Sequence, residues 1–250
     1  MSKVPTLEEL LEAGVHFGHQ SSRWHPKMGE FIFGKRGGVH IIDLEKTQSQ
    51  LEKAKTFVAG IVSRGGYVMF LGTKAQTKGY VEAAAKSCGM PYVTERWLGG
   101  TITNFEEIHK LIKRLADLKR RKETGDLKKY KKKEQLMFAR EIEDLEEKVG
   151  GIATLSKLPE AVIVFDVRNE LTAVKEASRS GVKVVALCDT NINPRPIDYV
   201  VPSNDDAVRS IELMTNQFAE AVLEGKKNAP VKGAVKPGAK KPVAKKVAIK

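Results

Sequence analysis

The sequence has little cysteine and no long apolar run. Its only two cysteines, Cys88 and Cys188, lie 100 residues apart, so they form neither a CxxC pair nor a disulfide framework, which is typical of a reducing compartment. No apolar run approaches the ~18 residues that a membrane-spanning helix needs, and the N-terminus lacks the basic-then-apolar pattern of a signal peptide. We therefore expect a soluble, cytoplasmic protein with no membrane partner.

The motifs of nucleotide-dependent and nucleophilic enzymes are also missing. The chain has no GxGxxG after a strand, no GxxxxGK[ST] and no GxSxG. Gly72-Thr73-Lys74 after an apolar run resembles a phosphate-binding loop only in part, and a strand-to-helix turn explains it better. We predict no catalytic residue and no required cofactor. The alternative is an α/β enzyme that binds a nucleotide or a phosphorylated metabolite at this turn and near Asp189.

An alternation of strands and helices indicates the fold class. Near-continuous apolar runs joined by helical segments are typical of a parallel sheet that helices cover on both faces. The runs span residues 67–71, 161–165, 184–187 and 199–201. We predict a doubly wound α/β domain. A short helix at residues 6–14, a polar-aromatic loop, and a hairpin with a basic tip at residues 31–42 precede it.

The alternation is interrupted at residues 105–150, where 14 basic and 11 acidic side chains make up over half of the segment. Two sets of apolar residues step by three and four, which predicts two helices with narrow seams and charged outer faces. The seams are Ile108, Leu111, Leu115 and Leu118, and then Phe138, Ile142, Leu145 and Val149. With Asn104 and Glu107 as a capping box, we predict an inserted antiparallel coiled-coil hairpin.

Positive charge is concentrated at the C-terminal end. The formal net charge is +12, but residues 226–250 hold nine lysines and no acid, so they carry +9 and residues 1–225 carry +3. This Lys/Ala/Pro-rich segment cannot bury enough apolar surface to order itself, which predicts a disordered tail. The predicted divisions are residues 1–104 and 151–225 for the two parts of the α/β domain, 105–150 for the hairpin and 226–250 for the tail.

Histidines and aspartates suggest one metal site. His16, His19 and His25 have a spacing that matches no zinc motif. Asp166 and Asp189 follow separate strands, and Asp205 and Asp206 begin the last helix. Because parallel strand ends meet at one edge, these carboxylates could hold a structural divalent cation, Mg²⁺ or Zn²⁺. The candidate ligands are His25, Asp189 and Asp205, and helix caps or loop contacts are the competing interpretation.

Basic residues next to aromatic ones favour RNA binding. Such clusters combine phosphate neutralisation with surfaces on which unpaired bases stack, the proposed role of Trp24 and Trp97. Without a module that reads bases, binding would follow shape and backbone. The candidate contacts on the globular part are Arg23, Trp24, His25, Lys27, Lys35, Arg36, Lys74, Arg96 and Trp97. Those on the hairpin are Lys110, Lys113, Arg114, Arg120, Arg121, Lys128, Lys129 and Lys132. A solvated hairpin tip would carry the same charges, and a DNA-compacting protein is a third hypothesis that the tail alone suggests.

Eight sequence blocks, in order and with matching spacing, resemble the bacterial small-subunit ribosomal protein S2 family over residues 5 to about 224. The first four are Gly14-Val15-His16-Phe17-Gly18-His19-Gln20, Trp24-His25-Pro26-Lys27-Met28, Ile32-Phe33-Gly34 leading to Val39-His40-Ile41-Ile42-Asp43-Leu44, and Phe70-Leu71-Gly72-Thr73-Lys74. The others are Arg96-Trp97-Leu98-Gly99-Gly100 with Thr103-Asn104, Leu158-Pro159, Asp189-Thr190-Asn191, and Pro202-Ser203-Asn204-Asp205-Asp206-Ala207.

The resemblance implies a flavodoxin-like α/β domain with a protruding helical hairpin. It further implies a structural, non-catalytic component of the small ribosomal subunit that sits between head and body on 16S-type rRNA, beside other small-subunit proteins. Relatives in many bacteria help dock ribosomal protein S1, and the family supports subunit assembly and translation. Two features depart from the family. The loop Ile192-Asn193-Pro194-Arg195-Pro196 is less acidic than in many relatives, which weakens the metal hypothesis, and the Lys/Ala/Pro-rich tail is not a core family feature.

Overall fold

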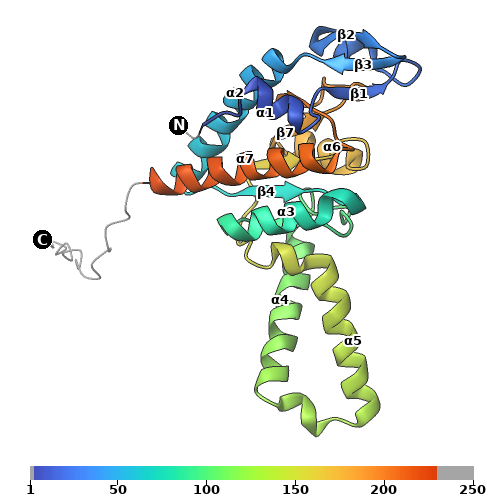
Figure 1. Ribbon diagram of the computed structural model, residues 1–250. Coiled ribbons are helices and arrows are strands. Elements are labelled where there is room, and N and C mark those ends of the chain that lie inside the picture. The colour runs from blue at the N-terminus through green and yellow to red at the C-terminus, as the bar shows by residue number, and fades with distance from the viewer. Residues whose placement is uncertain (1–2, 230–250) are drawn as a thin grey trace, which may run out of the picture.

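The computed structural model describes residues 3–229, and its centre is a parallel sheet of five strands (Figure 1). The strands are β4 (Val68–Leu71), β5 (Tyr92–Val93), β6 (Ala161–Val164), β7 (Lys183–Cys188) and β8 (Tyr199–Pro202). Their spatial order is β5-β4-β6-β7-β8, and every pair is parallel. This is the 2-1-3-4-5 order of flavodoxin-like, doubly wound sheets, which confirms the predicted Rossmann-like α/β class.

Both faces of this sheet are buried, because alternate residues of each strand enter different cores. Val68 and Phe70 pack with α2 (Leu44–Ser63), α3 (Ala75–Cys88) and α7 (Val208–Lys227). Met69 and Leu71 point to the other face, which α6 (Leu171–Arg179) and residues near the ends of the helical hairpin cover. Figure 1 shows α7 running between α2 and α3, and both of these helices contact it. The near-continuous apolar runs are therefore buried on both sides, as expected.

A second, smaller sheet lies at the N-terminal end of the chain. Its strands are β1 (Phe17–Gln20), β2 (Ile32–Arg36) and β3 (Val39–Ile42), in the antiparallel order β1-β3-β2. The predicted helix is α1 (Leu7–Glu12), with the capping box of Thr6 and Glu9 in place. The prediction of a loop at residues 17–20 was wrong. This segment pairs with β3 from Phe17 to Ile41 and from Gln20 to Val39, although it has no alternation of apolar and polar residues.

Two long helices project from the sheet domain side by side (Figure 1). They are α4 (Phe105–Glu123) and α5 (Lys132–Val149), and the 3₁₀ turn η2 (Asp126–Lys129) connects them. In the second predicted seam Ile142, Leu145 and Val149 are buried as expected and Phe138 is half-buried. The first seam differs, because Leu111 is 36% exposed and Ile112 takes its place at 6%. Asn104 precedes α4 without a side-chain capping hydrogen bond, so this predicted capping box is wrong. The chain leaves the helices through η3 (Gly150–Ile152).

The last helix is longer than expected. The sequence predicts its end near Leu223, whereas α7 continues to Lys227, because Lys226 donates from Nζ to the carbonyl oxygen of Cys88 over 2.6 Å. The predicted boundary at residue 225 therefore falls inside this helix. The rest of the predicted tail, residues 230–250, lies outside the described residues.

Candidate functional site

The loops after β4, β6, β7 and β8 meet at the carboxyl edge of the large sheet, and we call this place the crevice. Lys74 precedes α3, and its Nζ contacts three carboxylates from the other loops: Asp206 directly, and Asp166 Oδ2 and Asp205 Oδ1 at 3.8 Å each. Burial alone would lower the pKa of the Lys74 ammonium, but Asp206, Asp205 and Asp166 outweigh it and raise this pKa. Lys74 thus neutralises the protein's own carboxylates, and its role as an RNA contact stays a prediction.

The turn before Lys74 is likewise bonded within the protein. Its neighbour Thr73 donates from its backbone N–H to Glu170 Oε1 over 3.2 Å, and its hydroxyl also contacts that oxygen. Burial raises the pKa of the Glu170 carboxyl, and the two bonds from Thr73 oppose this only in part. The interpretation of Gly72-Thr73-Lys74 as a strand-to-helix turn agrees with these contacts, since Thr73 and Lys74 both engage acidic side chains of this chain.

His19, and not the predicted His25, is the histidine of the crevice. His19 Nδ1 lies 3.1 Å from Asp189 Oδ2, and its Nε2 lies 3.5 Å from Asp206 Oδ2. The contact with Asp189 raises the pKa of this imidazole, although burial opposes it. His25 instead caps η1 (Pro26–Phe31), where its Nδ1 accepts from the Lys27 N–H over 3.2 Å. His25 therefore does not belong to the group of donor atoms that the structure brings together, and its assignment as a ligand stays a prediction.

The carboxylates of the crevice exceed its cations. Asp205 is 3% exposed, and burial together with Asp189 and Asp166 raises its pKa from 3.8 to about 7. Asp206, on the rim, has its pKa lowered, chiefly by the hydrogen bond from Lys74. The donor atoms of His19, Asp205 and Asp206 all lie within 4.8 Å of one another. These three side chains could hold a cation, and two of them are absent from the predicted set.

The small sheet is attached to this same edge. The backbone N–H of His25 donates to the Thr190 carbonyl oxygen over 2.7 Å, and the N–H of His19 donates to Thr190 Oγ1 over 2.9 Å. Asn204 donates from its backbone N–H to the Val15 carbonyl oxygen over 3.1 Å. The N-terminal loop therefore folds over the ends of β7 and β8, and this fixes the small sheet relative to the large one.

The predicted cations of the small sheet are accessible. Arg23, Lys35 and Arg36 are exposed, and Lys27 is half-buried. In the part of the chain that the structure describes, none of these four has an ion-pair partner. The Trp24 side chain is 38% exposed, and its ring centroid lies 5.0 Å from that of His40. This surface presents cations and one exposed aromatic face, a combination that suits unpaired RNA bases.

Arg96 and Trp97, adjacent in sequence, differ in accessibility. Arg96 is exposed, whereas Trp97 is 8% exposed, and its indole N–H donates to Glu176 Oε1 over 3.3 Å. Trp97 belongs to the core beneath the sheet. Its predicted role as a stacking surface is therefore wrong, because the ring is covered and its only polar atom already has a partner.

The cations of the helical hairpin fall into two groups, and all are on its surface. Five of the predicted residues pair with acids of the same hairpin: Lys110 with Glu107 at 2.5 Å, Arg114 with Glu141 at 2.9 Å, Arg120 and Arg121 with Asp117 at 2.6 and 2.8 Å, and Lys129 with Asp126 at 3.4 Å. Exposed pairs of this kind contribute about 0–1 kcal/mol each. Within residues 3–229, the other three, Lys113, Lys128 and Lys132, have no acidic partner.

Sequence reasoning missed two buried acids, Glu170 and Glu176. Both belong to the start or body of α6, and both bond to loops that lie far away in sequence. A signal was present for Glu176, because it lies three residues after Ala173 and one before Ala177, on the apolar side of the helix. An acid among buried alanines indicates a partner, because a buried charge is costly without one.

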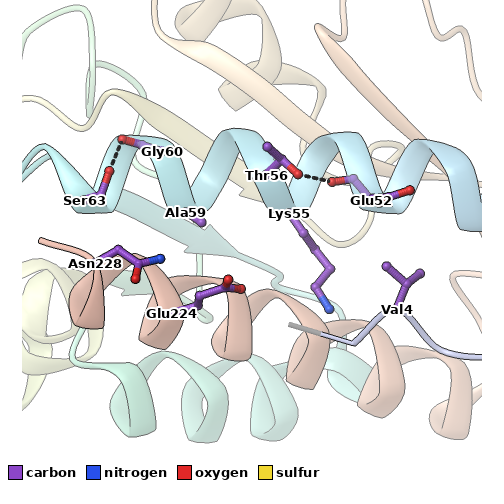
Figure 2. A pocket seen from close by; sticks show the side chains of 9 residues that line it. All are labelled: Val4, Glu52, Lys55, Thr56, Ala59, Gly60, Ser63, Glu224 and Asn228. Carbon is purple, nitrogen blue, oxygen red and sulfur yellow. Dashed lines mark hydrogen bonds between the residues drawn. The ribbon is translucent and has the colours of Figure 1, made fainter. Parts of the chain in front are cut away.

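A separate cavity of about 220 Å³ lies between α2 and α7 (Figure 2). Its lining is mixed, with Val4 at one end and Ser63 and Asn228 at the other. The buried Lys55 reaches from α2 past this cavity, and its Nζ donates to the Lys3 carbonyl oxygen over 2.9 Å and to Gln217. Burial lowers the pKa of Lys55. These contacts tie the N-terminal segment to α2 and α7.

None of the helices in residues 3–229 combines the length and the apolar character that crossing a bilayer requires. The fold and the site together define a doubly wound α/β protein whose crevice is filled by its own ion pairs, and whose small sheet and projecting helical hairpin both carry accessible cations.

Comparison with known proteins shows the family of this chain. A family described as ribosomal protein S2 matches residues 10–225. The small ribosomal subunit protein uS2 of Francisella tularensis subsp. novicida (strain U112) is 50% identical over 218 residues, which are 87% of this chain and 91% of the relative. The protein of the same name from Francisella philomiragia is 49% identical over the same length. The chain belongs to the ribosomal protein S2 family. It is therefore a structural protein and not an enzyme, as the missing motifs predicted.

Proposed function

We propose that this protein is a structural constituent of the small ribosomal subunit, in the cytoplasm, where it binds 16S-type rRNA through shape and phosphate contacts and supports subunit assembly and translation. The observation that carries this proposal is a set of four cations in or next to the small sheet, Arg23, Lys27, Lys35 and Arg36, which have no ion-pair partner among the described residues and belong to the same part of the chain as the exposed Trp24. The relatives are small-subunit proteins by name. Neighbouring small-subunit proteins are the other expected partners.

The organisation that we propose follows the predicted divisions. Residues 1–104 and 151–225 form the globular part, and residues 105–150 form a coiled-coil hairpin inserted into it. The buried seam of Ile108, Ile112 and Leu115 against Ile142 and Leu145 supports this, since these residues step by three and four. Arg96 stands at the entrance of the hairpin, and Lys113, Lys128 and Lys132 are among the hairpin cations that have no ion-pair partner within the described residues. The tail would add phosphate contacts that do not depend on sequence.

The decisive experiment is reconstitution of small subunits with charge variants. Lys35→Glu combined with Arg36→Glu should weaken binding to 16S rRNA and reduce the slope of log affinity against log salt by about 0.7–0.9 for each lost phosphate contact. Lys53→Glu on α2 is the matched control, because Lys53 is exposed but lies outside the proposed surface. In a sucrose gradient of cell lysate, the parent should migrate with small subunits and dissociate at high salt. Equal salt slopes for the parent and the double variant would contradict the proposed surface.

A docking site for ribosomal protein S1 is the second part of the proposal. An apolar groove of about 460 Å³ lies between α1, the small sheet and the start of α2. Leu11 is 56% exposed in it and Phe33 is 78% exposed, and exposed apolar surface of this kind fits a protein partner better than RNA. Phe33→Ser should weaken capture of purified S1, whereas Leu171→Ser, at an exposed position on α6, should not. Equal capture by both variants would contradict this site.

A structural divalent cation is the third part. The Nδ1 atom of His19 contacts Asp189, and its Nε2 atom faces Asp206. In many metal sites one ring nitrogen of a histidine contacts a carboxylate in this way, and the other nitrogen binds the metal. A cation there would offset the excess of carboxylates that raises the pKa of Asp205. A mixed nitrogen and oxygen donor set favours Zn²⁺ over Mg²⁺. In calorimetric titration with Zn²⁺, His19→Ala should lose binding and His25→Ala should retain it. Loss of binding in the His25 variant alone would restore the first assignment.

A further inference from the structure

The loop that leads into the hairpin surrounds one buried carboxylate. Glu176 is 8% exposed. Its Oε1 accepts from the Gly100 N–H over 2.8 Å and from the Trp97 indole over 3.3 Å. Its Oε2 accepts from the Ile102 N–H over 3.3 Å and from the Thr103 hydroxyl over 3.4 Å. Four donors from one short segment therefore converge on a side chain that belongs to another part of the fold.

This loop has the construction of an anion-binding site. Gly100 adopts φ +92°, which L side chains rarely do, and successive N–H groups that point into one concavity are a known way to bind an anion. The anion here is the protein's own. Burial raises the pKa of Glu176, but the hydrogen bonds from Gly100, Ile102 and Trp97 outweigh it, so that the net shift is downward and the group stays ionised.

Glu176 is also the polar link between the hairpin entrance and the sheet domain. Among residues 3–229, every hydrogen bond that joins residues 97–104 to the rest of the globular part ends on this carboxylate. The segment ends at Asn104, immediately before α4. Glu176 itself lies on α6, beside the buried Ala173 and Ala177. The direction in which α4 leaves the sheet domain therefore depends on a bond to α6.

We propose that Glu176 is a positioning residue that sets the orientation of the hairpin relative to the sheet, and that it thereby presents the distal cations Lys128 and Lys132 to RNA. The second half rests on the proposed RNA-binding function, and the first half does not. Loss of the carboxylate leaves the loop with unpaired donors. The hairpin then swings over a range of angles, while the cores on the two faces of the large sheet stay folded.

The orientation is tested on the free protein by a distance measurement between two spin labels. One label is attached at Lys128→Cys near the hairpin tip and the other at Arg209→Cys on α7; both positions are exposed, whereas Cys88 and Cys188 are buried. Glu176→Ala should broaden or shift the distance distribution, and the isosteric Glu176→Gln should do so less. Glu170→Gln is the matched control, because Glu170 is equally buried and adjoins the same helix but bonds to Thr73. It should keep the parental distribution.

A local readout separates positioning from general loss of stability. In Glu176→Gln the Gly100 and Ile102 amides should exchange with solvent roughly tenfold faster or more, given the strength of bonds to a charged acceptor, while amides of β6 and β7 keep their rates. A folded Glu176→Ala protein with the parental distance distribution would overturn the proposal. So would faster exchange spread evenly over the sheet, because that pattern indicates global destabilisation.

The RNA half is tested in reconstituted small subunits with an iron–EDTA probe at the Lys128 position. The Glu176→Ala background should reduce or move cleavage of 16S rRNA several-fold, while a probe at Lys53→Cys on the globular part keeps its pattern. A changed distance with unchanged cleavage would retain Glu176 as the determinant of orientation. The same result would contradict the hairpin as an RNA contact, so that the two claims fail separately.

Discussion

Replacing Gly151 by alanine should destabilise the protein at the exit of the hairpin. An added Cβ would lie 2.3 Å from the Tyr92 carbonyl oxygen and 2.9 Å from two atoms of its ring. Contacts of this kind essentially never fall below 3.0 Å, so the two backbones must separate by at least 0.7 Å. Tyr92 cannot easily retreat, because β5 is held to β4 by the Phe70 N–H, which donates to the Pro91 carbonyl oxygen over 2.9 Å.

The expected cost follows from this overlap. Overpacking against a fixed backbone costs about 1–3 kcal/mol, and 2 kcal/mol corresponds to a fall in Tm of about 4–8 °C for a chain of this size. Urea unfolding of Gly151→Ala should show a lower midpoint with an unchanged slope, since the surface exposed on unfolding is the same. Gly99→Ala is the matched control at the hairpin entrance, because nothing lies within 4 Å of its added Cβ. A Gly151→Ala midpoint equal to that of Gly99→Ala would refute the reasoning.

Three further predictions concern charge and thiol chemistry. Burial raises the pKa of Glu170, so the protonated side chain stabilises the fold fully below the ordinary glutamate range, and this stabilisation is lost as pH rises through the folded pKa. The free energy of unfolding of Glu170→Gln should therefore exceed that of the parent at pH 8 but not at pH 4. Burial raises the pKa of Cys88 to about 11 and also raises that of Cys188, so a thiol reagent at pH 8 should label neither until urea is added, and prompt labelling would contradict their burial. Removal of residues 230–250, which leaves α7 intact, should flatten the salt dependence of RNA binding, because this segment holds seven lysines and no acid; an unchanged slope would exclude a phosphate-binding tail.

The large sheet could be predicted because its signal is local. Val68–Leu71 and Ala161–Val164 are apolar at every position and buried on both faces, so the pattern alone defines each strand. Phe17–Gln20 has no such pattern, and it is a strand only because β3 pairs with it. The apolar spacing of this helix also could not decide whether Leu111 or Ile112 is buried in the seam. Steps of three and four allow either residue, and the position of α5 decides between them.

The candidate site was predictable in part, and the assignments that differ from the structure have a common cause. Lys74, Trp97 and His25 were assigned from residue type and local context, whereas the structure shows that each has a partner within the protein. For Trp97 that partner is Glu176, 79 residues further along the chain. The partner of Lys74 was within reach of sequence reasoning. Because parallel strand ends meet at one edge, the argument that gathered Asp166 and Asp205 also places Lys74, after β4, among them.

The arrangement of charge explains how this fold can serve as a scaffold without catalysing a reaction. At the edge where doubly wound enzymes bind their ligands, the carboxylates bind Lys74 and His19 of this chain, and Thr190 and Asn204 bind the small sheet. Buried carboxylates are therefore used internally, with Asp189 contacting His19 of the small sheet and Glu176 holding the hairpin entrance, while Arg23, Lys35 and Arg36 are exposed and have no ion-pair partner among the described residues. In the proposed function, the affinity of residues 1–225 for a polyanion cannot come from total charge, because these residues carry a net charge of only +3. It depends on holding the two cation-bearing elements at fixed positions, so substitutions that loosen either attachment should weaken RNA binding without removing a single positive charge.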